Sequence, residues 1–161
     1  DTLARVNRGH GFAEYEAATR AARARGIPVC CHLIVGLPGE DASHSHASLD
    51  RVLEVGVDGL KLHPLHVVKH TRLAIDWKRG EYEPLAEADY TRIAADLIER
   101  TPWEVVYHRV TGTAAPDILL APAWCAKKWD VLNGIADELA RRGSRQGART
   151  GHPWKETHHA A

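Results

Sequence analysis

The chain has 161 residues, a length that suits one ordinary domain and allows a sizeable hydrophobic core. Its 21 Lys and Arg residues balance its 21 Asp and Glu residues, so it lacks the overall positive charge that draws proteins to nucleic acid or anionic lipid. Three cysteines are too few for a secreted disulfide framework, so we expect a cytoplasmic protein. No apolar run approaches the roughly 18 residues that span a bilayer, and no signal peptide is recognisable, so no membrane association is expected.

The first half of the chain is predicted to alternate between helices and strands. Residues 12–25 are rich in Ala, Glu and Arg, with apolar positions at helical spacing. The apolar run 29–36 has the length of a strand and lacks strict alternation, as expected for a strand that is covered on both faces. A second helix is predicted over 43–55, and a second strand over 57–62, which Pro64 closes.

The second half is predicted to contain helices over 71–79 and 86–100, a third strand over 104–110 and a long helix over 123–142. We expect the ordered part to end at Gly143. The predicted organisation is one domain over residues 1–143 and a polar, Gly-rich tail over 144–161, which is either loose or held by Trp154.

Helical connections between successive strands indicate an α/β fold with about three parallel strands and covering helices. Three parallel strands alone would leave an apolar edge strand unpaired, which favours aggregation. The chain also begins at Asp1 and contains no Met. We therefore expect a fragment, with further strands preceding Asp1.

Side-chain alternation is expected to collect polar groups on one face of this sheet. The first strand groups Cys30, His32 and Ile34, and the second groups Gly59, Lys61 and His63, with Leu60 and Leu62 facing the helices. In the third strand, strict alternation separates Val106, His108 and Val110 from Tyr107 and Arg109. Because an unpaired ammonium group is costly in an apolar interior, Lys61 indicates that the polar face borders a space that contains water.

Two loops have features of binding sites. The GLPGE loop, residues 36–40, follows the first strand, and its glycines allow a ligand to approach the backbone closely. It lacks the Gly-x-Gly-x-x-Gly and Walker spacings, so a plain strand-to-helix turn is favoured over a nucleoside triphosphate site. After the third strand, Arg109 with Thr111 and Thr113 offers a guanidinium and two hydroxyls suited to a carboxylate or a phosphate.

Three histidines near the end of the second strand, His63, His66 and His70, are candidate metal ligands because imidazole suits zinc. A proline interrupts regular structure between them, and the His-Glu-x-x-His pattern is absent, so no metal site is predicted. The adjacent cysteines Cys30 and Cys31 lie in an apolar strand and are interpreted as small hydrophobic side chains.

Five segments that extend over nearly the whole chain are LARVNRGH, CCHLIVGLPGE, GVDGLKLHPLHVVK, YHRV and LLAPAW. Taken in this order, they resemble the radical S-adenosylmethionine (radical SAM) superfamily. The resemblance is strongest to its YhcC-like branch, which is related to the elongator catalytic subunit and to oxygen-independent coproporphyrinogen oxidase. It implies the carboxyl-terminal half of a parallel partial (β/α) barrel that binds S-adenosylmethionine and a [4Fe–4S] cluster.

The resemblance also implies which residues form the site. The residues expected to bind the cofactor are Arg8, His32, Ile34, Gly36, Leu37, Pro38, His63 and Pro64. The residues expected to line the substrate pocket are Lys61, His66, His108 and Arg109. No catalytic residue is assigned.

The Cys-x-x-x-Cys-x-x-Cys loop that holds the cluster in this family is absent from the sequence. We expect the cluster ligands upstream of Asp1 and expect this chain alone to be inactive. Its expected role is to supply part of the S-adenosylmethionine site and of the substrate pocket for 5′-deoxyadenosyl-radical chemistry, on a substrate that the sequence leaves open. Kinship with the elongator subunit raises RNA as a partner, although the net charge of zero does not support it.

Two alternatives remain open at this stage. One is a zinc-dependent barrel hydrolase that uses His63, His66 and His108. The other is a non-catalytic remnant or binding module whose strands pair with another polypeptide.

Overall fold

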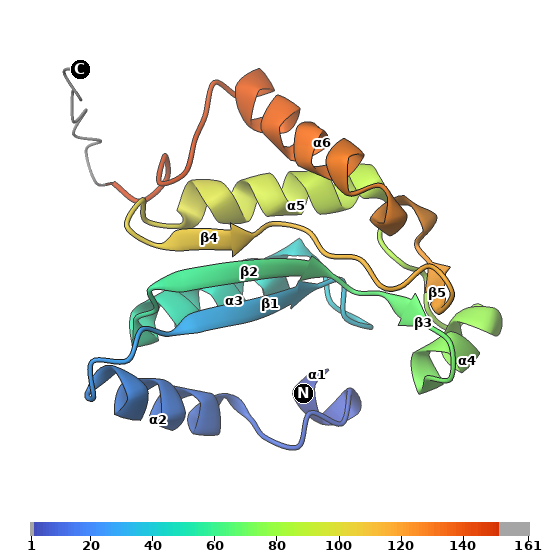
Figure 1. The fold of residues 1–161 in the computed structure, drawn as a ribbon, viewed down its shortest axis with the longest axis horizontal. Helices are drawn as coiled ribbons and strands as arrows, with labels where there is room; N and C mark the ends of the chain where they lie inside the picture. The colour runs from blue at the N-terminus through green and yellow to red at the C-terminus, as the bar shows by residue number, and fades with distance from the viewer. Residues whose placement is uncertain (1, 152–161) are drawn as a thin grey trace.

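The computed structural model of the protein describes residues 2–151. Its central sheet contains three parallel strands, β1 (Cys30–Val35), β2 (Gly59–Pro64) and β4 (Val106–Arg109), in the spatial order β1-β2-β4 (Figure 1). Each connection between these strands carries at least one helix, which allows the chain to return and pair in parallel. The predicted α/β class and the three parallel strands are confirmed.

Helices connect and cover the strands. They are α1 (Thr2–Arg5), α2 (Phe12–Arg23), α3 (Ala42–Val55), α4 (Arg72–Lys78), α5 (Glu87–Arg100) and α6 (Lys128–Arg141). At the start of α3, the carboxylate of Asp41 accepts hydrogen bonds from the backbone N–H groups of Ser43 and His44, which would otherwise lack partners. Within residues 2–151, every helix is too short or too polar to cross a bilayer.

The prediction of one long helix over 123–142 is wrong, because the helical conformation is interrupted at Lys127. A 3-10 helix, η1 (Ala123–Ala126), comes first, and Lys127 has φ −102° and ψ 65° before α6 begins. The side chain of Trp124 donates a hydrogen bond of 3.0 Å to the carbonyl oxygen of Leu85. This contact holds η1 against the segment that precedes α5, and the non-helical Lys127 separates η1 from α6.

A second, antiparallel sheet pairs β3 (Val67–Val68) with β5 (Leu119–Ala121), and the sequence pattern did not predict it. Together with α4, it lies beyond the carboxyl ends of β1 and β2 (Figure 1). Val67, Ala74 and Ala121 form a small buried cluster there. Strands of two or three residues are too short to show an alternating pattern, which explains why they were missed.

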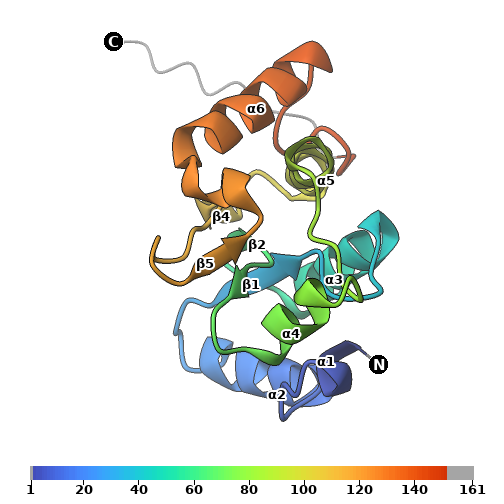
Figure 2. The ribbon, with the colours of Figure 1, turned by 90° about the vertical axis from the view of Figure 1, so that its right-hand side faces the viewer.

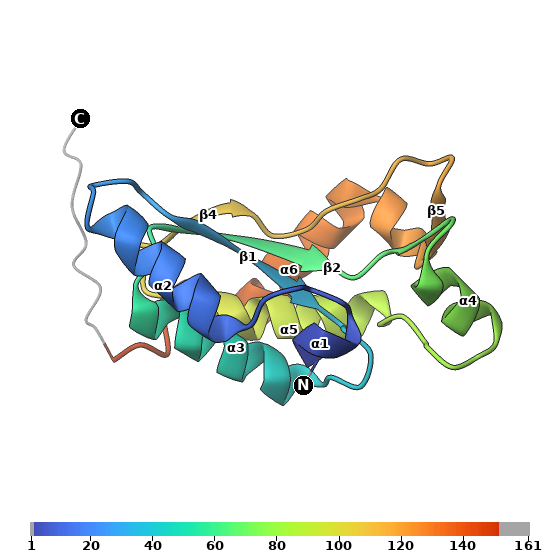
Figure 3. The same cartoon turned by 90° about the horizontal axis from the view of Figure 1, so that it is seen from below.

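The main hydrophobic core lies between the large sheet and helices α3 and α5, which cover the same side of that sheet (Figure 2, Figure 3). Leu49 of α3, Leu97 of α5, and Leu60 and Leu62 of β2 are fully buried in it. The opposite side of the sheet carries no helix within residues 2–151 (Figure 3). Ile34 precedes the buried Val35 in β1, so its side chain lies on this side, and it is 47% exposed. This uncovered side is called the bare face below.

Helix α6 is joined to α5 by an ion-pair network around Arg142. Its guanidinium lies 2.7 Å from Asp96, 3.0 Å from Glu99 and 2.8 Å from Glu138. Glu99 is almost completely buried and also pairs with Arg149 at 2.7 Å. Because each buried charge has an opposite partner, the network offsets the cost of removing these groups from water.

Residues 144–151 pack against the end of α5 and the loop that follows it. The side chain of Gln146 donates to the carbonyl oxygens of Pro102 and Val105, both at 2.8 Å. The expectation that the ordered part ends at Gly143 is therefore wrong, because these hydrogen bonds and the Arg149 ion pair attach the following segment. Trp154, expected as an anchor, lies outside the described residues.

Candidate functional site

The bare face carries the side chains that alternation predicted for β1 and β2. His32 and Ile34 of β1 are exposed, and Lys61 and His63 of β2 are partly exposed. The strands pair with His32 beside Lys61 and Ile34 beside His63. Side chains at intervening positions, such as Leu62, are buried in the core. The prediction that these polar groups share one face is confirmed.

The imidazole rings of His32 and His63 stack on this face, with 5.6 Å between ring centroids and 13° between ring planes. Burial lowers the pKa of both imidazoles, and the nearby cations lower it further, Lys61 most for His32 and Arg109 most for His63. Both rings are therefore neutral at pH 7. The Nε2 atom of His63 is buried and has no hydrogen-bond partner among residues 2–151.

Arg109 lies on the bare face, contrary to the strict alternation expected for the third strand. The pairing of β2 with β4 shifts register between Leu60 and Lys61, so that Leu60 pairs with Tyr107 and Lys61 pairs with Arg109. An irregularity of this type inserts one extra residue and turns a following side chain to the other face. Tyr107 and Val110 pack against the core, whereas His108 and Arg109 are exposed.

Two glycines allow the histidines of this face to sit close to the backbone. A Cβ atom at Gly112 would lie 2.5 Å from Nδ1 of His63, and one at Gly59 would lie 2.6 Å from Nε2 of His108. The Nε2 atom of His66 lies 3.0 Å from the carbonyl oxygen of Gly112, and burial lowers the pKa of this imidazole. Contacts with the nearby backbone at Gly59 and Gly112 therefore position the rings of His63, His66 and His108.

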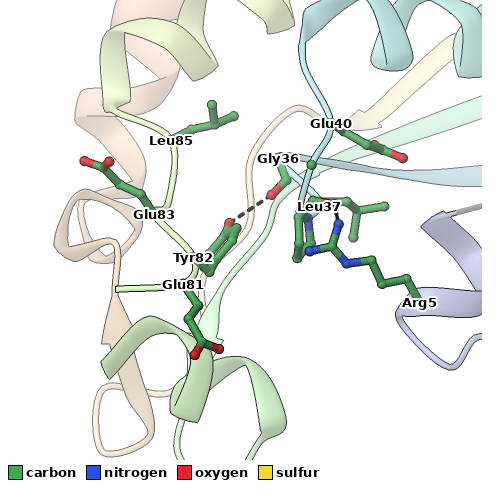
Figure 4. A pocket seen from close by; sticks show the side chains of 10 residues that line it. Arg5, Gly36, Leu37, Glu40, Glu81, Tyr82, Glu83 and Leu85 are labelled. Atoms are coloured by element: carbon green, nitrogen blue, oxygen red, sulfur yellow. Dashed lines mark hydrogen bonds between the residues drawn. The ribbon is translucent and has the colours of Figure 1, made fainter. Parts of the chain in front are cut away.

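The GLPGE loop after β1 borders a separate cavity of about 170 Å³ (Figure 4). The hydroxyl of Tyr82, from the segment between α4 and α5, donates a hydrogen bond of 2.9 Å to the carbonyl oxygen of Gly36. The guanidinium of Arg5 donates one of 3.2 Å to the carbonyl oxygen of Pro38. Gly36 has φ 92°, in the left-handed region that favours glycine. The cavity is also lined by Leu37, Gly39, Glu40, Glu81, Glu83 and Leu85.

The residues expected to bind a cofactor are thus divided between two places. His32, Ile34 and His63 lie on the bare face, and Gly36, Leu37 and Pro38 line the loop cavity. Pro64 is buried at the end of β2.

Arg8 is exposed in the turn after α1, and the arginine that contacts the loop is Arg5. Sequence reasoning missed Arg5 and Tyr82, whose contacts join positions 33 and 46 residues apart. Contacts over such separations leave no local pattern in the sequence.

Among residues 2–151, no three His, Cys, Asp or Glu side chains are placed to hold a metal ion together. The histidines considered for zinc do not converge, because the Nε2 atom of His66 contacts Gly112 while the ring of His108 lies over Gly59 at the other end of β2. The arrangement does not support the zinc hydrolase alternative.

Known proteins with similar sequences match most of the chain, and a solved structure with the same fold does so as well. The family model described as Radical_SAM C-terminal domain matches residues 57–141. Protein YhcC of Escherichia coli K12 is 47% identical over 153 residues, which are 95% of this chain and 49% of that protein. Protein YtqA of Bacillus subtilis 168 is 37% identical over 142 residues, which are 88% of this chain and 44% of that protein. The chain thus spans about half the length of the curated relatives that it matches.

A solved structure, that of Elp3 from the archaeon Methanocaldococcus infernus with an amino-terminal deletion, has the same fold. It matches with a TM-score of 0.78 and 21% sequence identity, over 90% of this chain and 34% of that chain. At this identity, the likeness concerns the fold alone.

Proposed function

Because the chain belongs to the radical SAM family, we propose that it supplies part of the S-adenosylmethionine site and of the substrate pocket for 5′-deoxyadenosyl-radical chemistry. The observation that carries the proposal is the bare face, where partly exposed polar and apolar side chains stand on a sheet whose other side is covered by helices. Ligands of parallel α/β folds bind near the carboxyl ends of the strands, where this face meets the GLPGE loop.

The adenosine side of the site is assigned to the bare face at Ile34 and His63 and to the loop that follows β1. Ile34 is an exposed apolar side chain next to the flat ring of His63. An adenine base that stacks here would remove apolar surface from water. These residues therefore fit a planar base with its ribose.

The substrate side is assigned to Lys61, His66, His108 and Arg109. Lys61 lies two residues before His63 in β2, and Arg109 is its register partner in β4. These two cations are therefore closer to the amino ends of the strands than Ile34 and His63 are. Their proposed role is to bind and orient a substrate next to the adenosine.

The cysteines of this chain do not fit a [4Fe–4S] cluster. Burial raises the pKa of the Cys31 thiol, and it raises that of Cys125 to about 12, whereas a cluster ligand must be a thiolate. Cys30 is partly exposed on the bare face, but the chain has no cysteine at the spacing that the family's cluster loop requires. We therefore propose that the cluster ligands come from outside this chain, and no step through the cluster is assigned to its residues.

An NMR titration of the isotope-labelled chain with S-adenosylhomocysteine, a stable analogue, tests the assignment. We expect backbone shifts concentrated at residues 32–38 and 61–64. Gly36→Ala should weaken binding, because the new Cβ lies 3.0 Å from Leu85 and the backbone has φ 92°. The matched control is Gly80→Ala, which places the same strain at φ 73° in the turn after α4 and meets no atom within 4 Å.

Equal binding by the two glycine variants, or shifts confined to the helix-covered side, would contradict the assignment. Absence of any shift with S-adenosylhomocysteine would instead favour the alternative of a non-catalytic binding module.

A further inference from the structure

We infer that the substrate of this site carries an oxyanion, a carboxylate or a phosphate, which Lys61 and Arg109 bind on the bare face. This inference rests on the proposed function, since it names the chemical class of the molecule that occupies the substrate side. Its basis is the placement of the two cations and the lack of carboxylate partners for them.

The register shift between β2 and β4 makes Lys61 and Arg109 paired positions on neighbouring strands. His32 is the register partner of Lys61 on the other side. A lysine, an arginine and an imidazole thus form one row across the three strands. All three side chains can donate hydrogen bonds to a group that binds along this row.

Neither Lys61 nor Arg109 forms an ion pair with any carboxylate in the described part of the chain. By contrast, basic side chains on other surfaces do: Arg23 pairs with Asp58, and Arg72 pairs with Asp76. The cations that act on His32 and His63 are Lys61 and Arg109. The bare face therefore has a local positive charge, although the chain as a whole has a net charge of zero.

A positive row of this kind favours an anion and disfavours an amine or a metal cation. The planar fork of Arg109 matches the two oxygens of a carboxylate or a phosphate, and the ammonium of Lys61 adds a second charge. The neutral ring of His32 can donate one further N–H. S-adenosylmethionine also carries a carboxylate, so the experiment has to separate this source of the anion from the substrate.

Inorganic phosphate and succinate are suitable probes, titrated into the labelled 161-residue chain at constant ionic strength while the C2 protons of His32 and His63 are followed by NMR. We expect both signals to shift, and we expect Lys61→Gln and Arg109→Gln each to weaken binding about tenfold, as for the loss of one charge-assisted hydrogen bond. Lys128→Gln and Arg20→Gln are the matched controls, because both side chains are exposed on outer helices. Circular dichroism verifies that each variant is folded.

The inference fails if neither probe shifts the two histidines, or if the control variants weaken binding as much as the bare-face variants. It also fails if Lys61→Gln and Arg109→Gln weaken S-adenosylhomocysteine but not 5′-methylthioadenosine, which lacks the carboxylate, because the anion would then belong to the cofactor. Unchanged S-adenosylhomocysteine binding in both variants supports the substrate assignment. If the wild-type chain binds phosphate but not S-adenosylhomocysteine, the proposed function fails while the anion site stands.

Discussion

The hydroxyl of Tyr82 donates a hydrogen bond of 2.9 Å to the carbonyl oxygen of Gly36, and it thereby joins the segment between α4 and α5 to the end of β1. Gly36 cannot form a regular strand hydrogen bond at this point, because its φ of 92° turns the chain out of the sheet. Tyr82 is half-buried, and burial raises the pKa of its hydroxyl to about 12, so it remains a proton donor at pH 7. The position of the GLPGE loop therefore depends on this contact.

Tyr82→Phe should lower the free energy of unfolding by about 1 kcal/mol, because a partly buried carbonyl loses its partner while the ring is retained. Urea denaturation followed by circular dichroism measures the change. Glu81→Gln, at the neighbouring exposed position, is the control and should stay within about 0.5 kcal/mol of wild type. Equal stability of Tyr82→Phe and wild type would show that the hydrogen bond contributes nothing.

Gly112→Ala and Gly134→Ala should change stability in opposite directions. At Gly112 the added Cβ would lie 2.5 Å from Nδ1 of His63, so the ring must leave its stack on His32, and we expect a loss of about 1–3 kcal/mol. At Gly134, inside α6, the nearest atom is the hydroxyl of Thr91 at 3.5 Å, an ordinary contact. There the change should stabilise by about 0.5–1 kcal/mol, because alanine favours a helix more than glycine does.

Thermal or urea unfolding of the two glycine variants gives both values. The ring of His63 provides an independent readout, since its NMR signals should move in Gly112→Ala and remain in place in Gly134→Ala. Stabilisation by Gly112→Ala would contradict the close approach of His63 to this part of the backbone.

The two cations of the bare face should act unequally on the two histidines. Lys61 exerts the larger charge effect on His32, and Arg109 exerts the larger one on His63. Removing a cation favours the imidazolium, so the pKa of His32 should rise more in Lys61→Gln than in Arg109→Gln. The pKa of His63 should rise more in Arg109→Gln than in Lys61→Gln.

This crossed pattern is measured by titrating the imidazole C2 protons at low ionic strength, where screening is weak. Lys128→Gln should leave both midpoints unchanged. If Arg109→Gln raises neither pKa, Arg109 does not face the histidines, and the register shift at Lys61 is not as described.

The stability of the protein should decrease as the pH is lowered, because the carboxylate of Glu138 becomes protonated. Its hydrogen bonds with Arg141 and Arg142 lower its pKa from 4.5 to about 2. Because the folded-state pKa lies below the unfolded one, the stabilisation is complete above about pH 4.5 and is lost as the pH falls towards 2. Glu138→Gln should reduce the pH dependence of unfolding in that window. Asp137→Asn, at an exposed position of the same helix, is the control, and an unchanged slope in Glu138→Gln would refute the assignment.

Much of the fold could be predicted because it depends on local patterns. Helical spacing identified α2, α3 and α5, and runs of apolar residues identified β1, β2 and β4, with boundaries that differ by a few residues. Alternation also identified which side chains of β1 and β2 share the bare face, since adjacent residues of a strand point to opposite sides. The order of these elements then indicated a parallel α/β sheet.

The candidate site was only partly predictable. His32, Ile34, Lys61 and His63 follow from alternation within their own strands. Arg109 does not, because the face that it occupies depends on where β4 shifts against β2. Tyr82 and Arg5 reach the GLPGE loop from distant segments.

The sequence by itself determined helices α2, α3, α4 and α5, the parallel strands and the residue types on the face of β1 and β2, because these follow from the spacing of neighbouring residues. Only the tertiary structure decided the placement of Arg109 beside Lys61, the contact of Tyr82 with Gly36 and the break between η1 and α6. Each of these depends on a partner strand or a distant side chain. Such interactions form only after the chain has folded, and no local pattern encodes them.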